Sequence, residues 1–131
     1  MTLTPLYAGL LTLFYVALSF RVIGRRRAQK ISLGDGNDAD MERRIRVHGN
    51  FAEYVPLALI LMALIELQDK PDLVVHAIGL LIIAGRLLHV IGVSATIFPA
   101  RVFGMVLTFA ALITGALANI GIASLVTGAA G

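Results

Sequence analysis

Four long apolar stretches alternate with short polar ones along the chain. The first, Met1 to Phe20, contains no charged residue, and the last continues without charge from residue 102 to 131. The only longer run of turn-forming residues is 31–40, which is rich in Gly, Asp and Asn. A helix needs about 20 apolar residues to cross a bilayer. The pattern therefore predicts one all-α domain over residues 1–131, a membrane four-helix bundle with helices at about 1–22, 41–66, 73–93 and 101–126.

The composition indicates a membrane protein and excludes several other classes of protein and site. Of 131 residues, 58% are hydrophobic and 15% charged, and the mean hydropathy is +0.87. The chain has no cysteine, which excludes disulfides, thiolate metal sites and a protein thiol nucleophile. Any sulfur chemistry must come from a substrate. The Lys and Arg residues gather at helix ends rather than among aromatic residues, so we expect no nucleic-acid partner.

Positive charge is distributed unevenly among the predicted connections. Residues 21–46 hold eight of the eleven Lys and Arg residues, 66–72 hold one, and the region of the third connection holds Arg86 and Arg101. The positive-inside rule then places the first and third connections in the cytoplasm. The second connection, with Glu66, Asp69 and Asp72, and both termini are expected outside.

Polar residues also enter the apolar stretches, where they are costly and usually functional. Helical spacing places Arg43, Arg46, Asn50 and Glu53 along one stripe of the second helix. Arg86 and His89 share a face of the third helix, and Arg101 opens the fourth at a similar depth. Arginines can hold carboxylates, while Glu53 and Asn50 can receive an ammonium or N–H group. A small zwitterionic or anionic peptide fits this mixture, and a nearby guanidinium would favour the thiolate of a thiol ligand.

Two segments resemble the signature of a known family. The stripe of the second helix reads Arg46-x-x-x-Asn50-x-x-Glu53-Tyr54-x-Pro56, which is similar to a motif of the MAPEG superfamily, the membrane-associated proteins in eicosanoid and glutathione metabolism. A second segment resembles a block from the bacterial, microsomal glutathione transferase-like branch of this superfamily. It reads Gly85-Arg86-Leu87-Leu88-His89, followed by Gly92 and by Arg101-x-x-Gly104. The helix order and the basic first connection agree, so the likeness extends over essentially the whole chain.

The resemblance implies an assembly and an activity. It implies a homotrimer in the bacterial inner membrane, with glutathione bound as a co-substrate between neighbouring subunits near the cytoplasmic face. The expected reactions are conjugation of glutathione to lipophilic electrophiles and reduction of lipid hydroperoxides.

The resemblance also implies particular site residues. Arg101 lies close to the family's thiolate-stabilising arginine, after one inserted residue in the alignment, and is the predicted catalytic residue. Where the eicosanoid-forming members have two tyrosines on the third helix, this chain has His89 and Val93. The predicted glutathione-binding residues are Arg25, Arg26, Arg46, Asn50, Glu53, Tyr54, Arg86 and His89.

Simpler interpretations remain open for these residues. Arg25 and Arg26 can serve topology alone, Arg86 can extend to the interface, and the stripe of the second helix can be an ion pair and amide bridge that holds subunits together. Four glycines on the third and fourth helices favour close helix packing, namely Gly79, Gly85, Gly92 and Gly115. The three histidines do not share a face, so no metal site is expected.

Two other function classes also remain open. A non-catalytic glutathione- or anion-binding membrane protein would not need the missing tyrosines. A small transporter is disfavoured, because such transporters carry an acid in the first helix and Met1 to Phe20 has none.

Overall fold

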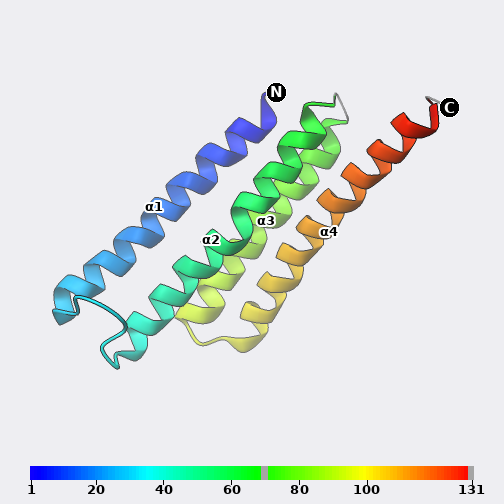
Figure 1. The fold of residues 1–131 in the computed structure, drawn as a ribbon. Helices are drawn as coiled ribbons and strands as arrows, with labels where there is room; N and C mark the ends of the chain where they lie inside the picture. The colour runs from blue at the N-terminus through cyan, green and yellow to red at the C-terminus, as the bar shows by residue number, and fades with distance from the viewer. Residues whose placement is uncertain (69–70, 130–131) are drawn as a thin grey trace.

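The chain folds into four long helices in up-and-down order (Figure 1). In the computed structural model these are α1 (Leu3–Gln29), α2 (Ala39–Glu66), α3 (Asp72–Ser94) and α4 (Phe98–Ala129). The structure describes the backbone of residues 1–68 and 71–129, and the side chains of these residues except 122–127 and 129. Asp69 and Lys70 of the predicted outer connection lie outside the described residues. The described part contains no strand, which confirms the predicted all-α class.

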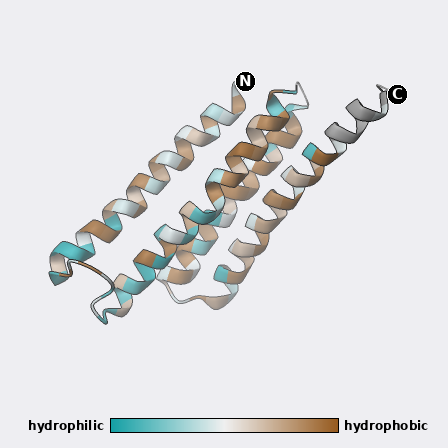
Figure 2. Ribbon diagram, viewed as in Figure 1, coloured by the Kyte–Doolittle hydropathy of each residue, from teal (hydrophilic) through white to brown (hydrophobic). Residues whose placement is uncertain are grey.

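All four helices are long and apolar enough to cross a membrane. Figure 2 shows that hydrophilic residues gather at the end of the bundle that carries the α1–α2 connection. Both termini lie at the opposite end (Figure 1). This arrangement is the one expected for a four-helix membrane domain.

Helix α1 continues to Gln29, beyond the end expected near residue 22. Residues 25–29 read Arg-Arg-Arg-Ala-Gln, which are good helix formers. Lys30 then adopts a left-handed conformation with φ 54°, and the backbone N–H of Ile31 donates to the Arg26 carbonyl at 3.0 Å. The basic cluster assigned to the first connection therefore lies largely on α1.

Helices α2 and α4 also begin earlier than expected. The Asp38 side chain caps α2 by accepting a hydrogen bond from the backbone N–H of Met41 at 2.6 Å. Helix α4 begins at Phe98 and contains Pro99 in its first turn, where proline removes no helical hydrogen bond. Arg101 consequently lies one turn inside α4 rather than at its start.

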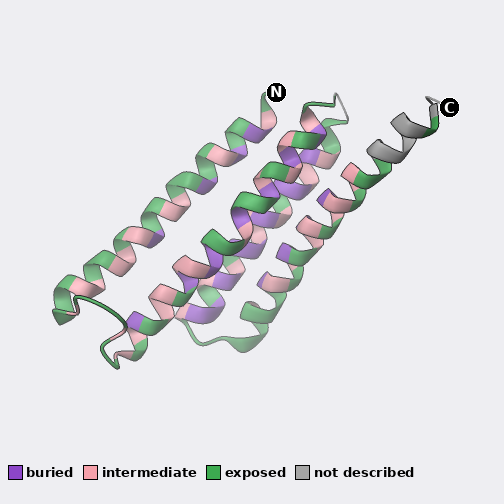
Figure 3. Ribbon diagram, viewed as in Figure 1, coloured by how far each residue is buried: buried purple, intermediate pink, exposed green. Residues whose placement is uncertain are grey.

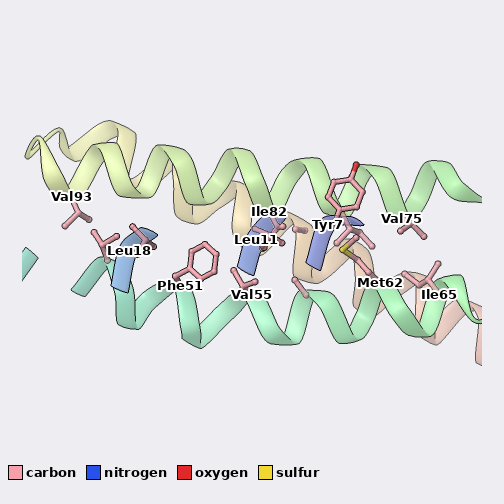
Figure 4. Close-up of a cluster of buried hydrophobic side chains, with 14 residues drawn as sticks. Tyr7, Leu11, Leu18, Phe51, Val55, Met62, Ile65, Val75, Ile82 and Val93 are labelled. Carbon is pink, nitrogen blue, oxygen red and sulfur yellow. The ribbon is translucent and has the colours of Figure 1, made fainter. Parts of the chain in front are cut away.

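Apolar side chains of all four helices form the core. Tyr7 and Leu11 of α1 meet Phe51 and Val55 of α2 and Ile82 of α3 in Figure 4. Buried residues are concentrated on α2 and α3, and fewer lie on α1 and on the described part of α4 (Figure 3). Within the described residues α1 and α4 make no contact with each other. Their outer faces are thus available to lipid or to another subunit.

Helices α3 and α4 approach each other most closely, and glycine permits this approach. A Cβ atom at Gly92 would lie 2.2 Å from the backbone nitrogen of Arg101, and one at Gly104 would lie 2.6 Å from the backbone nitrogen of His89. A Cβ at Gly85 would meet the Thr108 hydroxyl at 2.8 Å. The close-packing role predicted for the helix glycines is confirmed at all four positions, since Gly79 packs on Tyr7 and Gly115 on Leu61.

Candidate functional site

A buried arginine lies at the centre of the polar residues inside the bundle. The Arg86 side chain is only 1% exposed. Its guanidinium donates hydrogen bonds to the amide oxygen of Asn50 on α2 and to the hydroxyl of Thr108 on α4, and it lies 3.3 Å from the sulfur of Met105. Arg86 therefore joins three helices through one side chain.

No carboxylate in the described part of the chain forms an ion pair with Arg86. Its Nε is buried and has no hydrogen-bond partner there. Removing an arginine from water without a counter-charge is costly. The Arg86 cluster, meaning Arg86 with Asn50, Thr108, Met105 and Tyr54, therefore carries uncompensated positive charge.

The polar stripe predicted on α2 divides between two edges of the helix. Asn50 is 4% exposed and faces Arg86, whereas the side chains of Arg46 and Glu53 are 57% and 50% exposed and pair with each other at 3.5 Å. An α-helix turns about 100° per residue, so a stripe with spacings of four and three residues is broad. Asn50 lies on its inner edge, and Arg46 and Glu53 lie on its outer edge.

Tyr54 connects this stripe with α4. Its ring packs edge-on against Phe109, with centroids 5.6 Å apart and an interplanar angle of 86°. The guanidinium of Arg86 lies 5.6 Å from the centroid of the same ring, a cation–π geometry. Tyr54 is therefore more than an interfacial aromatic residue, because it helps to hold the buried charge.

Three of the predicted arginines influence the buried His89 electrostatically. It is 3% exposed, and the charges of Arg86, Arg101 and Arg46 all act on its imidazole. These arginines come from α3, α4 and α2 respectively. The predicted arginines of three helices therefore act electrostatically on one buried imidazole.

Arg25 and Arg26 lie elsewhere in the subunit. Arg25 forms a two-point ion pair with Asp38, with nitrogen–oxygen distances of 3.1 and 2.6 Å, and Arg26 donates to the Gly34 carbonyl at 2.8 Å. The Arg25 hydrogen bond and the Met41 N–H hold the pKa of Asp38 below its ordinary value. Within one subunit, both arginines therefore organise the first connection instead of reaching the Arg86 cluster.

A groove opens beside the site, at the end of the bundle that carries the α3–α4 connection. It has a volume of about 290 Å³ and places one arginine of α2 and one of α4 on the same cavity. We call it the cationic groove, lined by Arg43, Gly92, Val93, Thr96, Phe98 and Arg101. Arg101 is exposed here, and in the part of the chain that the structure describes its side chain has no ion pair or hydrogen bond.

The sequence reasoning missed the α4 side of the Arg86 cluster. Arg101, Gly104 and Thr108 recur at spacings of three and four, which places them on one face of a helix. This periodicity was the available signal for Thr108. Thr108 also donates to the Gly104 carbonyl at 2.8 Å, which leaves its oxygen free to accept from Arg86.

Comparison with known proteins agrees with this architecture. The model of the MAPEG family matches residues 4–121. The chain is 37% identical over 117 residues to inner membrane protein YecN of Escherichia coli K12 and to a protein of the same name from Escherichia coli O6:H1, and each alignment covers 89% of both chains. The chain therefore belongs to the MAPEG family and is an integral membrane protein with four apolar helices. This membership confirms the resemblance inferred from the motifs.

Proposed function

We propose that this protein is a glutathione-dependent enzyme of the bacterial inner membrane. It would conjugate glutathione to lipophilic electrophiles or reduce lipid hydroperoxides. The observation that carries the proposal is the buried Arg86, which has no carboxylate partner in the described chain, together with the groove that Arg43 of α2 and Arg101 of α4 both line. Uncompensated positive charge inside a membrane domain favours an anionic ligand. Family membership and the name of the Escherichia coli relatives support the class and the location.

The chemistry of glutathione matches the available groups. The peptide carries two carboxylates, one ammonium group and one thiol. Arg46 and Arg101 are exposed and suit the carboxylates and the thiolate, whereas Glu53 suits the ammonium. The shape and charge of the site behind these contacts would be set by four further residues, Asn50, Tyr54, Arg86 and His89.

Assembly would complete the site. The outer faces of α1 and α4 are apolar and uncovered within one subunit, and closed symmetric association would bury them. In a homotrimer, Arg25 and Arg26 at the end of α1 would approach the site of the neighbouring subunit. Native mass spectrometry in mild detergent should give a trimer, and a dominant monomer or dimer would contradict this part of the proposal.

Arg101 would act by stabilising the thiolate. A free thiol has a pKa of about 8.5 and is mostly protonated at neutral pH. Beside a guanidinium the thiol proton would leave to water, and the sulfur would attack an electrophilic carbon to form a C–S bond while the leaving group departs. With a hydroperoxide, the sulfur would instead take the distal oxygen as the O–O bond breaks, and a second glutathione would complete reduction to the alcohol, water and glutathione disulfide.

The test is glutathione binding read together with thiolate absorbance on the purified protein. We expect saturable binding with thiolate visible at neutral pH. Arg101→Ala should remove most of the thiolate signal and lower turnover, and Arg101→Lys should retain part of both, since a point charge replaces the field but not the fork geometry. Arg27→Ala is the matched control, because Arg27 is an exposed arginine at the same end of the bundle. Full turnover in Arg101→Ala would assign the thiolate to another arginine.

A second candidate function is non-catalytic binding of glutathione or a related anion. The observation that favours it is on α3, where His89 is buried and Val93 lines the cationic groove with no hydroxyl. Saturable glutathione binding without thiolate at neutral pH, and without turnover of a model electrophile, would establish this function instead.

A further inference from the structure

The two arginines of the cationic groove make weaker contact with carboxylates than Arg25 and Arg44 do at the same bundle end. Arg25 and Arg44 contact the carboxylates of Asp38 and Asp40 at 2.6 and 2.9 Å. Arg43 reaches Asp40 only at 4.0 Å, beyond hydrogen-bond distance. Asp40 also lies 3.4 Å from Arg25, so three arginines share this carboxylate and Arg43 lies farthest from it.

Arg101 of α4 is the second arginine that lines the cationic groove. Glycine at position 92 lets the first turn of α4 lie directly on α3, which brings Arg101 over the end of α3. Gly92 and Val93 line the same groove as the two arginines. Two arginines on one cavity can bind the same anionic oxygens from two sides.

An apolar groove continues from the cationic groove along α4. It has a volume of about 530 Å³ and is lined by Phe98, Pro99, Val102, Phe103 and Val106. Phe98 lines both grooves, so the two are adjacent. From Phe98 to Val106 the apolar groove follows α4 away from the bundle end and toward the middle of the membrane segment.

We propose that these two grooves bind one anionic phospholipid of the surrounding bilayer. Its phosphate lies between Arg43 and Arg101, and one acyl chain follows Phe98, Val102 and Val106. The order of charge and apolar surface along α4 matches the order of headgroup and acyl chain in a bilayer leaflet, and basic pockets between membrane helices are suited to anionic headgroups. A soluble phosphate would use the arginines and leave the apolar groove empty.

The experiment is lipid retention measured by native mass spectrometry. The full-length protein is reconstituted in nanodiscs of phosphatidylglycerol and phosphatidylcholine in equal parts and then transferred to detergent. We expect phosphatidylglycerol to be retained preferentially, and Arg43→Gln to lower its retention by about fivefold, the effect of losing one well-placed cation. Arg27→Gln is the matched control, since it removes an exposed arginine of the same end that lines neither groove. Phe103→Ala should also weaken retention relative to Ile113→Ala, an equally exposed α4 position outside the groove.

Several outcomes would overturn the proposal. Equal losses in Arg43→Gln and Arg27→Gln would mean that only diffuse surface charge attracts the lipid. Equal retention of phosphatidylcholine would remove the role of the anionic head. If oleate added to the nanodiscs were retained in place of phosphatidylglycerol, the occupant would be a single-chain anion. Circular dichroism and the elution volume of each variant separate loss of the site from loss of the fold.

Lipid retention is measured without glutathione, so it stands or fails separately from the proposed enzyme. One consequence does rest on the proposed function, because phosphate and thiolate would compete for Arg101. Glutathione should then bind more weakly in phosphatidylglycerol than in phosphatidylcholine nanodiscs. Unchanged affinity, with phosphatidylglycerol retained, would place the thiolate away from the groove.

Discussion

The contact between α3 and α4 and the contact between α1 and α2 are built in different ways. Glycines bring the α3 and α4 backbones together, and the Arg86 cluster lies beside this contact. Helices α1 and α2 instead meet through large rings, with Tyr15 stacked on His48 at 4.6 Å and Phe14 edge-on to Phe51 at 5.2 Å. An apolar cavity of about 240 Å³ lies between these two helices.

Polar contacts at the two ends of α1 hold this helix against the bundle. At one end Arg25 pairs with Asp38, and at the other the Glu66 carboxylate accepts hydrogen bonds from the backbone N–H groups of Thr2, Leu3 and Thr4. Between the ends, Ser19 lies 3.0 Å from His48 and Tyr7 lies 2.8 Å from His76. The comparison indicates that glycines join the backbones of α3 and α4, whereas side chains attach α1 to the rest of the bundle.

Gly92→Ala should have the largest effect, because it adds an atom where two backbones meet. The new Cβ would lie 2.2 Å from the Arg101 nitrogen, and backbone atoms cannot move aside as a side chain can. We expect a loss of about 3 kcal/mol, at the upper end of the usual cost of overpacking, seen as a lower melting temperature in detergent. Gly9→Ala on α1 is the control, since nothing lies within 4 Å of its Cβ position. Equal melting of the two variants would contradict the close α3–α4 contact.

Asn50→Ala should have the next largest effect, because it leaves the buried guanidinium of Arg86 without its α2 acceptor. Loss of one partner from a buried polar pair costs about 1–3 kcal/mol. The double variant Asn50→Leu with Arg86→Met should recover part of this loss, since apolar residues replace a buried charge well. Gln68→Ala, an exposed amide at the end of α2, is the control and should change unfolding little. A double variant less stable than Asn50→Ala would show that the charge itself supports the fold.

Glu66→Gln should act on the α1 side alone. The negative carboxylate meets the positive end of the α1 dipole, an interaction worth about 0.3–1 kcal/mol. We expect faster hydrogen exchange at the amides of Leu3 and Thr4, with exchange on α3 and α4 unchanged. Asp72→Asn, an exposed acid at the start of α3, provides the matched control. Faster exchange throughout the bundle would mean that α1 opens together with α3 and α4.

A lower pH should slightly destabilise the end of α1 where Arg25 pairs with Asp38. The pKa of Asp38 is lowered by Arg25, so the folded state binds this proton less readily than the unfolded state. The stabilisation is complete above the unfolded pKa of about 3.9 and is lost as the pH falls through the lower folded value. Proteolysis of the 31–37 segment should therefore increase as the pH falls below about 4. Asp38→Asn should abolish this dependence and Glu42→Gln should preserve it.

The sequence by itself determined the class of this protein. Four apolar stretches of membrane length fixed the number of helices, and the spacing of Arg46, Asn50 and Glu53 with the block around Arg86 indicated the family. Both signals are local, because hydrophobic length and helical periodicity follow from the chain alone. The glycines of α3 also predicted a close helix contact, although the sequence did not identify the partner helix.

Only the tertiary structure decided how the polar residues divide. Spacing placed Asn50 with Arg46 and Glu53, but packing against α3 turned Asn50 inward to Arg86 and left the other two exposed. Arg25 and Arg26 were predicted to bind glutathione from the family resemblance, and within one subunit the longer α1 and the cap of α2 pair them with the first connection. The pairing of Arg43 with Arg101 on one groove depends on the crossing of α3 and α4 at Gly92. Such contacts join residues far apart in the chain, and helical periodicity within one segment carries no information about them.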